Sequence, residues 1–162
     1  MSKFQVDVVF FPDDKQMYPQ GFSTFILEDN FSHRLEGKSR PEHFKGVLTI
    51  VGKLFNIIRP SHAFFGEKDA QQIRVLQKMV TDLNYNLQIV PCPIVREANG
   101  LAMSSRNIYL SENNREKAGV IHRSLKKAEE MLVQGYHSVV DIREVVIAMI
   151  KTEKHIRLDY FS

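Results

Sequence analysis

An apolar run that ends in a glycine and leads straight into an amphipathic segment constrains the fold of this chain most strongly. Residues 63–65 are apolar, Gly66 follows, and apolar residues recur at helical spacing through residues 70–83. This order predicts a buried strand, a tight turn and the start of a helix. A further apolar run at residues 87–90 predicts the next strand. We therefore predict a βαβ unit with a right-handed crossover.

The segments before this unit carry three further patterns. Residues 6–11 are almost continuously apolar, which is typical of a parallel strand buried on both faces. Residues 23–27 fit another short strand, and the polar residues 28–41 fit a surface loop. Apolar residues spaced by three and four predict a helix over residues 43–58, which Pro60 ends.

The last third of the chain has the pattern of charged helices. Ser111 is an expected N-cap of an amphipathic helix that closes at Gly135 and carries Ala118, Ile121, Leu125, Ala128 and Leu132. Ser138 and Asp141 form an S-x-x-D start to another helix, with Ile142, Val145, Val146, Met149 and Ile150 on it. Residues 156–161 resemble the opening of a strand.

These elements together predict an α/β fold. We expect a Rossmann-like parallel sheet with flanking helices over residues 1–107, forming the latter part of a nucleotide-binding domain. A small helical α+β portion follows over residues 108–162, as the start of a smaller domain. The last predicted strand has no partner in the sequence, so we expect both the sheet and the second domain to be incomplete.

Composition excludes several classes of protein. With 162 residues and 43% apolar side chains, the chain can bury a sizeable core, which argues against disorder. No segment approaches the roughly 20 apolar residues of a membrane span, and no signal peptide is visible. The net charge of +3 is interspersed, without a basic run, which argues against a nucleic-acid partner. The single cysteine, Cys92, allows no internal disulfide and favours the cytoplasm.

The turn after the predicted strand places charge where ligands bind in open α/β sheets, outside the carboxyl ends of the strands. Lys68 stands there between Glu67 and Asp69, and Gln72 lies one turn into the helix. A lysine at this place can meet an anion that also faces the amides of the helix N-terminus. The same pattern suits an ordinary βα loop whose acids match the helix dipole.

Two other segments carry candidate ligand-binding residues. Ser104, Ser105 and Arg106 follow a glycine turn, and two hydroxyls beside a guanidinium can bind a polyphosphate. The alternative is a polar linker between domains. Arg40 and His43 flank the start of a predicted helix, where a solvated loop is the alternative. The six histidines have no metal-ligand spacing, so we predict no protein metal site.

Five motifs decide between these alternatives. They are Tyr18-Pro19-x-Gly21, Leu35-Glu36-Gly37-x-x-Arg40-Pro41-x-His43-Phe44-x-Gly46-Val47, Lys53-Leu54-Phe55-Asn56, Phe65-Gly66-Glu67-Lys68-Asp69-x-Gln71-Gln72, and Gly100-Leu101-Ala102-Met103-Ser104-Ser105-Arg106-Asn107-x-Tyr109-Leu110. In order and spacing they resemble the pantothenate synthetase (pantoate–β-alanine ligase) family of the nucleotidyltransferase α/β superfamily. The resemblance covers essentially the whole chain and is strongest from Tyr18 to Leu110.

The chain departs from the family pattern in two respects. Glu42 stands where the family usually has glycine, and an acid there is unfavourable for phosphate binding unless it points to solvent. The family's opening strand–helix unit, with its His-x-Gly-His motif, is absent, and the family's C-terminal domain is incomplete. We therefore expect a middle portion of the enzyme that is inactive by itself.

The resemblance implies a reaction and a set of site residues. The family joins pantoate to β-alanine with ATP and Mg²⁺, through a pantoyl-adenylate. It implies a cytoplasmic homodimer with these small-molecule substrates. By position, Lys68 would be catalytic and Gln72 would bind pantoate, with Arg40 and His43 in support. The residues implied for ATP binding are Gly66, Glu67, Lys68, Asp69, Val95, Met103, Ser104, Ser105 and Arg106.

Two alternative functions stay open at this point. Another nucleotidyltransferase of the superfamily, acting on a different acid or phosphate, shares the logic of these motifs but not the combination of residues 36–41 with Gln72. A non-catalytic module that self-associates through the apolar stripes of its middle helices is the second alternative. Substrate-dependent pyrophosphate release distinguishes the first from a pantoate ligase, and ATP binding distinguishes the second.

Overall fold

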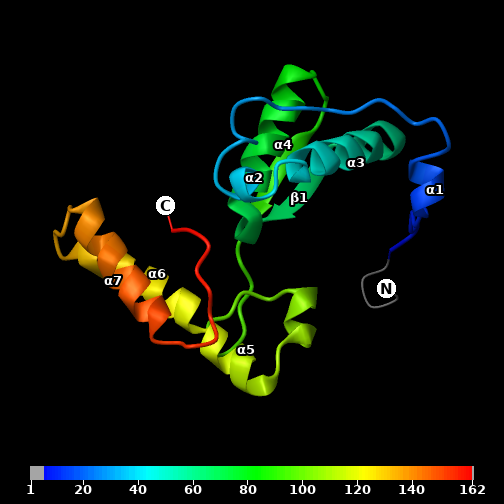
Figure 1. The fold of residues 1–162 in the computed structure, drawn as a ribbon. Coiled ribbons are helices and arrows are strands. Elements are labelled where there is room, and N and C mark those ends of the chain that lie inside the picture. Colours follow the sequence, from blue (N-terminus) through cyan, green and yellow to red (C-terminus); the bar gives the residue numbers. More distant parts are fainter. Residues whose placement is uncertain (1–5, 162) are drawn as a thin grey trace. The chain divides into compact units, whose positions relative to one another are not determined.

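The computed structural model describes residues 6–161, which form two compact units (Figure 1). The first unit contains the chain up to Phe64 together with Gln71–Val90. The second contains Phe65–Ala70 and the chain from Pro91 onward. This division differs from the predicted boundary at residue 107, and the assignment of residues 1–107 and 108–162 to two domains stays a prediction.

The order of elements in the predicted βαβ unit is confirmed, but its first strand, which the sequence predicts to be buried, has no buried residue, and Phe64 is 67% exposed. Strands β1 (His62–Gly66) and β2 (Gln88–Cys92) pair side by side in a parallel sheet, and helix α4 (Ala70–Asp82) connects them. Helix α3 (His43–Ile58) has the predicted bounds. The strand expected to end at Pro91 extends through it to Cys92. Two short helices complete the first unit, α1 (Asp14–Met17) and α2 (Glu36–Ser39).

The core of the first unit lies between α3 and α4. Leu48 of α3 and Leu76 of α4 are fully buried, as the apolar spacing predicts, and Val75 of α4 is fully buried although the spacing does not predict it. The other buried apolar side chains of this unit are Met17, Phe44, Phe55, Ile73, Met79 and Ile89. Burial of this set supplies the main stabilisation of the unit, because each large side chain removed from water contributes about 1.5–3 kcal/mol.

The strands predicted at residues 6–11 and 23–27 are wrong. Residues 6–11 form no β-ladder with any described segment, and Val8 and Phe11 are 82% and 93% exposed. A strand without a neighbour lacks both its hydrogen bonds and its packing partners. In the second segment the backbone N–H of Ile26 donates instead to the side chain of Thr49, at 3.0 Å. The sequence pattern alone does not reveal whether a partner strand is present.

The predicted surface loop at residues 28–41 is only partly correct, because it contains helix α2 and two buried residues, Ser32 and Gly37. Gln71 of α4 organises this segment. Its side-chain amide donates to the carbonyls of Phe31 (2.9 Å) and Arg34 (2.7 Å) and accepts from the N–H of Glu36 (3.1 Å).

The second unit is helical where it was predicted to be. Ser111 caps α5 (Glu112–Ala118), and Ser138 caps α7 (Val139–Lys151). Gly135 follows α6 (Val120–Val133) with φ +88°, which suits glycine. The single helix predicted after Ser111 is wrong, because it breaks at Gly119 into α5 and α6.

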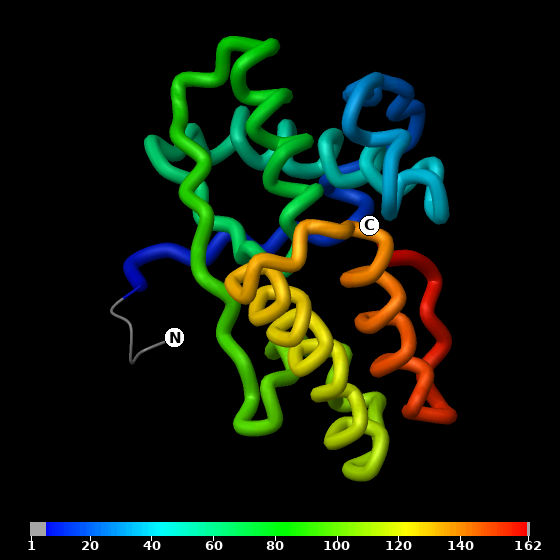
Figure 2. Tube along the Cα trace, turned by 90° about the vertical axis from the view of Figure 1, so that its left-hand side faces the viewer, coloured from blue at the N-terminus to red at the C-terminus, as the bar shows by residue number. Residues whose placement is uncertain are grey.

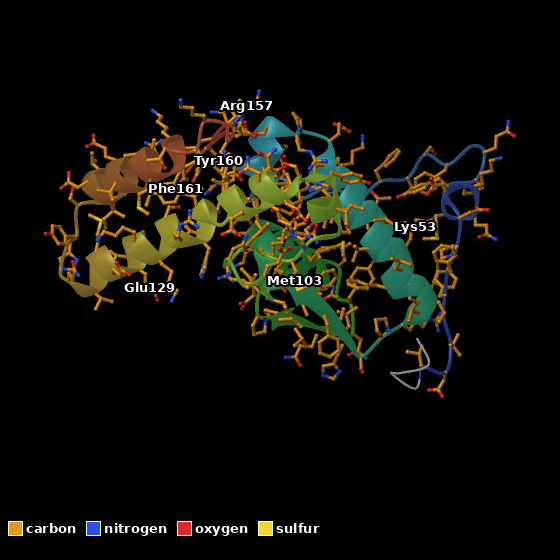
Figure 3. All side chains as sticks on the ribbon, turned by 90° about the horizontal axis from the view of Figure 1, so that it is seen from below. Lys53, Met103, Glu129, Arg157, Tyr160 and Phe161 are labelled. Atoms are coloured by element: carbon orange, nitrogen blue, oxygen red, sulfur yellow. The ribbon has the colours of Figure 1, made fainter. Side chains whose placement is uncertain are left out.

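Helices α6 and α7 pack side by side (Figures 1 and 2). Their shared core consists of Met131, Ile142, Val146 and Ile150. The strand predicted at residues 156–161 is wrong, since this segment forms no ladder within residues 6–161. Its apolar side chains pack on the helix pair instead, and Phe161 is seen against these helices in Figure 3.

Candidate active site

The predicted lysine lies at the carboxyl end of β1. Glu67–Asp69 form a 3-10 turn between Gly66 and the start of α4. The Lys68 ammonium lies 3.1 Å from a carboxylate oxygen of Asp69, and the two side chains are 44% and 57% exposed. Exposed pairs of this kind contribute only about 0–1 kcal/mol, so Lys68 can exchange this partner for a stronger anion at little cost.

Gly66 leaves its backbone uncovered at the end of the strand. Its φ of −70° is open to any residue, and a Cβ built on it meets no atom within 4 Å. Neither the conformation nor the packing of the described chain therefore requires glycine here. A bare backbone of this kind permits close approach of a ligand.

The second candidate segment begins with a hairpin. The N–H of Met103 donates to the carbonyl of Val95 (2.9 Å), and the N–H of Glu97 donates to the carbonyl of Leu101 (2.8 Å). Arg96 and Ala102 form an antiparallel bridge between these two bonds. Val95 and Met103 are 66% and 57% exposed at the open end of the hairpin.

The predicted phosphate-binding residues follow at once. Ser104 is the N-cap of a 3-10 helix, Ser105–Tyr109, and its hydroxyl accepts from the N–H of Arg106 at 3.2 Å. Ser105 and Arg106 are exposed, and Arg106 forms no ion pair with any residue in the range 6–161. The segment therefore presents a hydroxyl and a guanidinium to solvent.

The two predicted motifs belong to one unit. Gly66, Glu67, Lys68 and Asp69 belong to the same compact unit as residues 91–107. Gln72, Arg40 and His43 belong to the other unit. A cavity of about 330 Å³ in that other unit contains none of the predicted site residues. It is lined by Ile26, Leu27, Glu28, Asp29, Asn30, Leu48, Lys78, Met79, Asp82 and Leu83.

The start of α3 carries the supporting residues. Arg40 pairs with Glu36 at 3.2 Å, and its carbonyl accepts from the N–H of His43 at 3.0 Å. Glu42, which replaces the family's glycine, pairs with Lys45 at 2.9 Å, and its side chain is 80% exposed. Its carboxylate therefore points to solvent.

A polar cluster that the sequence did not reveal lies beside residues 104–106. The guanidinium of Arg115, on α5, donates two hydrogen bonds to Glu97, at 2.6 and 2.9 Å. The Asn107 amide donates to the same carboxylate at 2.7 Å. These bonds, those from Arg115 foremost, lower the pKa of Glu97, and the Glu97 carboxylate raises the pKa of Arg115.

The lowered pKa of Glu97 predicts an acid-sensitive contribution to stability. The folded protein binds this proton less readily than the unfolded chain, so the contribution is present above the usual glutamate pKa of about 4.3 and is lost as pH falls through the lower folded value. We expect Glu97→Gln to flatten the decline of the melting temperature between about pH 5 and pH 3. Melting temperatures of the unmodified chain and of Glu97→Gln, followed by circular dichroism across this pH range, measure the difference. Equal slopes would contradict the prediction.

A parallel sheet with flanking helices, a lysine at the carboxyl end of a strand and a hydroxyl–arginine segment together define an α/β protein of the nucleotidyltransferase-like class. The model of the pantoate-beta-alanine ligase family matches residues 1–162. The chain therefore belongs to the pantoate-beta-alanine ligase family.

Individual relatives agree with this assignment. The pantothenate synthetase of Acetivibrio thermocellus is 53% identical over 96% of this chain, and that of Pseudothermotoga lettingae is 49% identical over 99%. The crystal structure of pantothenate synthetase from Thermus thermophilus superposes with a TM-score of 0.94 at 41% identity over 98% of the chain. The chain spans 55%, 57% and 58% of these three proteins.

A solved ligase with bound ligands is also similar. The pantoate-beta-alanine ligase from Francisella tularensis, complexed with beta-gamma ATP and beta-alanine, has a TM-score of 0.76 at 34% identity. It aligns with 91% of this chain, and the chain spans 55% of it. Among the helices of residues 6–161, none has the length and apolar character needed to cross a membrane.

Proposed function

We propose that the protein containing this chain condenses pantoate with β-alanine at the expense of ATP. The observation that carries the proposal is the presence, in one compact unit, of Lys68 at the carboxyl end of β1 and of residues 104–106. Family membership and the ligands of the Francisella tularensis relative support the same reaction.

The reaction has two steps. A pantoate carboxylate oxygen attacks the α-phosphorus of ATP, and pyrophosphate leaves. The β-alanine amine then attacks the acyl carbon of the pantoyl-adenylate, and AMP leaves as pantothenate forms. A carboxylate resists nucleophiles, so the adenylate supplies the leaving group. The protein's task is to position the reactants and stabilise the charge that develops on the phosphate oxygens.

Lys68 would stabilise that charge. Its ammonium has only an exposed pair with Asp69, so it can turn to a phosphate oxygen. Glu67 and Asp69 would shape the nucleotide site, and the uncovered backbone at Gly66 would allow close approach. Residues 104–106 would bind the β- and γ-phosphates.

The remaining assignments rest on position. The exposed side chains of Val95 and Met103 offer apolar contact for adenine. Gln72 would hydrogen-bond pantoate, and Arg40 and His43 would support the site from the start of α3.

Mg²⁺ would accompany the triphosphate. Within residues 6–161 no group of three His, Cys, Asp or Glu side chains could hold a metal ion. Mg²⁺ is commonly bound by substrate phosphates and water with few protein ligands, so the triphosphate would take the place of most protein ligands. The ion would neutralise charge on the β- and γ-phosphates beside residues 104–106.

We also propose a homodimer in the cytoplasm. Ile57 and Ile58 at the end of α3 and Leu27 are each more than half exposed, which supports self-association of the first unit. The single cysteine supports a reducing compartment. Light scattering on the purified protein tests the dimer, and a monomer at micromolar concentration would contradict it.

The function is tested in a chimera in which this chain replaces the matching part of the Thermus thermophilus pantothenate synthetase. We expect pyrophosphate release that depends on pantoate, and AMP release with pantothenate formation when β-alanine is added. Release triggered by a different carboxylic acid, and not by pantoate, would instead identify another nucleotidyltransferase.

The 162-residue chain alone is expected to form no pantothenate. It spans only 55–58% of the relatives cited above, and its Lys68, Ser105 and Arg106 are exposed on the described surface. An adenylating site needs its reactants held on all sides, away from water. The measurement is AMP release by the purified chain with ATP, pantoate and β-alanine. Turnover comparable to the chimera would refute this expectation.

A further inference from the structure

We propose that Glu97, Arg115 and Asn107 form a positioning cluster that holds residues 104–106 in the conformation that receives the phosphates of a nucleotide. This inference deepens the proposed function and rests on it for the identity of the ligand. The three side chains join α5, the hairpin and the 3-10 helix within one compact unit.

Arg115 and Glu97 form a bidentate pair. The two bonds engage both carboxylate oxygens, Nε to Oε2 at 2.6 Å and a terminal nitrogen to Oε1 at 2.9 Å. The Glu97 side chain is only 16% exposed. Bidentate, charge-assisted pairs fix orientation more strongly than other polar contacts. Arg115 therefore anchors the hairpin to α5.

Asn107 links the two ends of residues 103–106. Asn107 is buried, and its side-chain nitrogen donates both to Glu97 at 2.7 Å and to the carbonyl of Ala102 at 3.1 Å. Ala102 precedes the segment and Asn107 follows it. The amide thus bridges the two ends of residues 103–106 and connects them to the anchored carboxylate.

The turn of the hairpin, at Asn99 and Gly100, is also held in place. The Asn99 amide donates to the carbonyl of Arg115 at 2.8 Å. Gly100 has φ +89°, and a Cβ there would lie 2.5 Å from Cδ2 of His122. The turn is therefore packed closely against α6, so the hairpin is held at both ends.

These contacts explain why the cluster acts on the loop and not on the ligand. Both oxygens of Glu97 are occupied by donors, and the Asn107 amide is already engaged with Glu97 and Ala102. By contrast, Ser105 and Arg106 remain exposed. A binding loop whose shape is set before the ligand arrives loses less freedom on binding.

The test compares Arg115→Gln and Glu97→Gln with a matched control, Arg123→Gln. Arg123 lies on α6 in the same unit, with a similar side-chain exposure (51% against 46% for Arg115), but its only described ion pair is a long one to Glu153. The first readout is amide hydrogen exchange in the 162-residue chain. We expect exchange at residues 103–107 to rise about tenfold or more in the two cluster variants, in line with the loss of a charged hydrogen bond.

The second readout is MgATP binding to the same proteins by calorimetry. We expect about tenfold weaker binding for Arg115→Gln. Arg115→Lys should recover part of the loss, because lysine restores the charge but not the bidentate geometry. The control should leave both readouts unchanged.

The two readouts separate failure of this inference from failure of the proposed function. Unchanged exchange at residues 103–107 in both cluster variants overturns the positioning role, as does a rise that is equal throughout α6 and α7. Absence of MgATP binding by the unmodified chain counts against nucleotide binding by this unit, while the exchange result still decides whether the cluster holds the loop.

Discussion

Replacement of Lys68 by alanine in the chimera is expected to lower the rate of adenylate formation about 10²–10³-fold, the usual loss for one preorganised charge-stabilising contact. The ammonium lies at the carboxyl end of β1 and is engaged only by the neighbouring Asp69. Removing it leaves the charge that develops on the phosphate oxygens without this cation. Because Lys68 is 44% exposed, the loss should appear in the rate with little change in the melting temperature.

Lys78→Ala is the matched control for this measurement. Lys78 lies on α4, which begins just after Lys68, is 42% exposed and has an equivalent pair with Asp82 at 2.5 Å. The same side chain is thus removed from a comparable environment outside the predicted site. We expect its single-turnover rate of pyrophosphate release to be near normal. A near-normal rate for Lys68→Ala, or an equal loss in both variants, would remove Lys68 from the catalytic role.

The helices could be predicted because their signals are local. The apolar spacing of residues 43–58 and the capping residues Ser111 and Ser138 lie within the elements they define. The break at Gly119 was missed, since it depends on packing at a distance: a Cβ there would lie 2.5 Å from the carbonyl of Asn99. On α6 the expected apolar positions Ile121, Leu125 and Leu132 are about half exposed, and the buried face begins one residue earlier, at Val120.

Strands and polar clusters depend on partners that the sequence does not specify. Residues 6–11 have the composition of a buried strand but no neighbour within the described chain. The Lys68 turn could be predicted because strand, glycine and helix follow one another directly. The pair of Glu97 and Arg115 could not, since 18 residues separate them and neither belongs to a recognisable spacing. Sequence therefore predicts elements that follow one another directly better than contacts between residues that lie far apart along the chain.

Gly37→Ala is expected to destabilise the first unit by about 3 kcal/mol, at the upper end of the usual range for overpacking. A Cβ on Gly37 would lie 1.5 Å from the carbonyl oxygen of Ser32. That carbonyl cannot move away freely, because Ser32 is buried and Glu28 accepts hydrogen bonds from both its N–H and its hydroxyl. To make room for the Cβ, the whole segment of residues 28–41, which Gln71 holds by hydrogen bonds, must shift.

Gly46→Ala makes the same glycine-to-alanine change, but we expect it to raise the free energy of unfolding instead of lowering it. Gly46 lies in the interior of α3, is exposed, and a Cβ there meets nothing within 4 Å. Alanine in such a position stabilises a helix by about 1 kcal/mol relative to glycine. Urea unfolding of both variants, followed by circular dichroism, measures the difference. Equal free energies of unfolding for the two variants would contradict the close packing of Ser32 on Gly37.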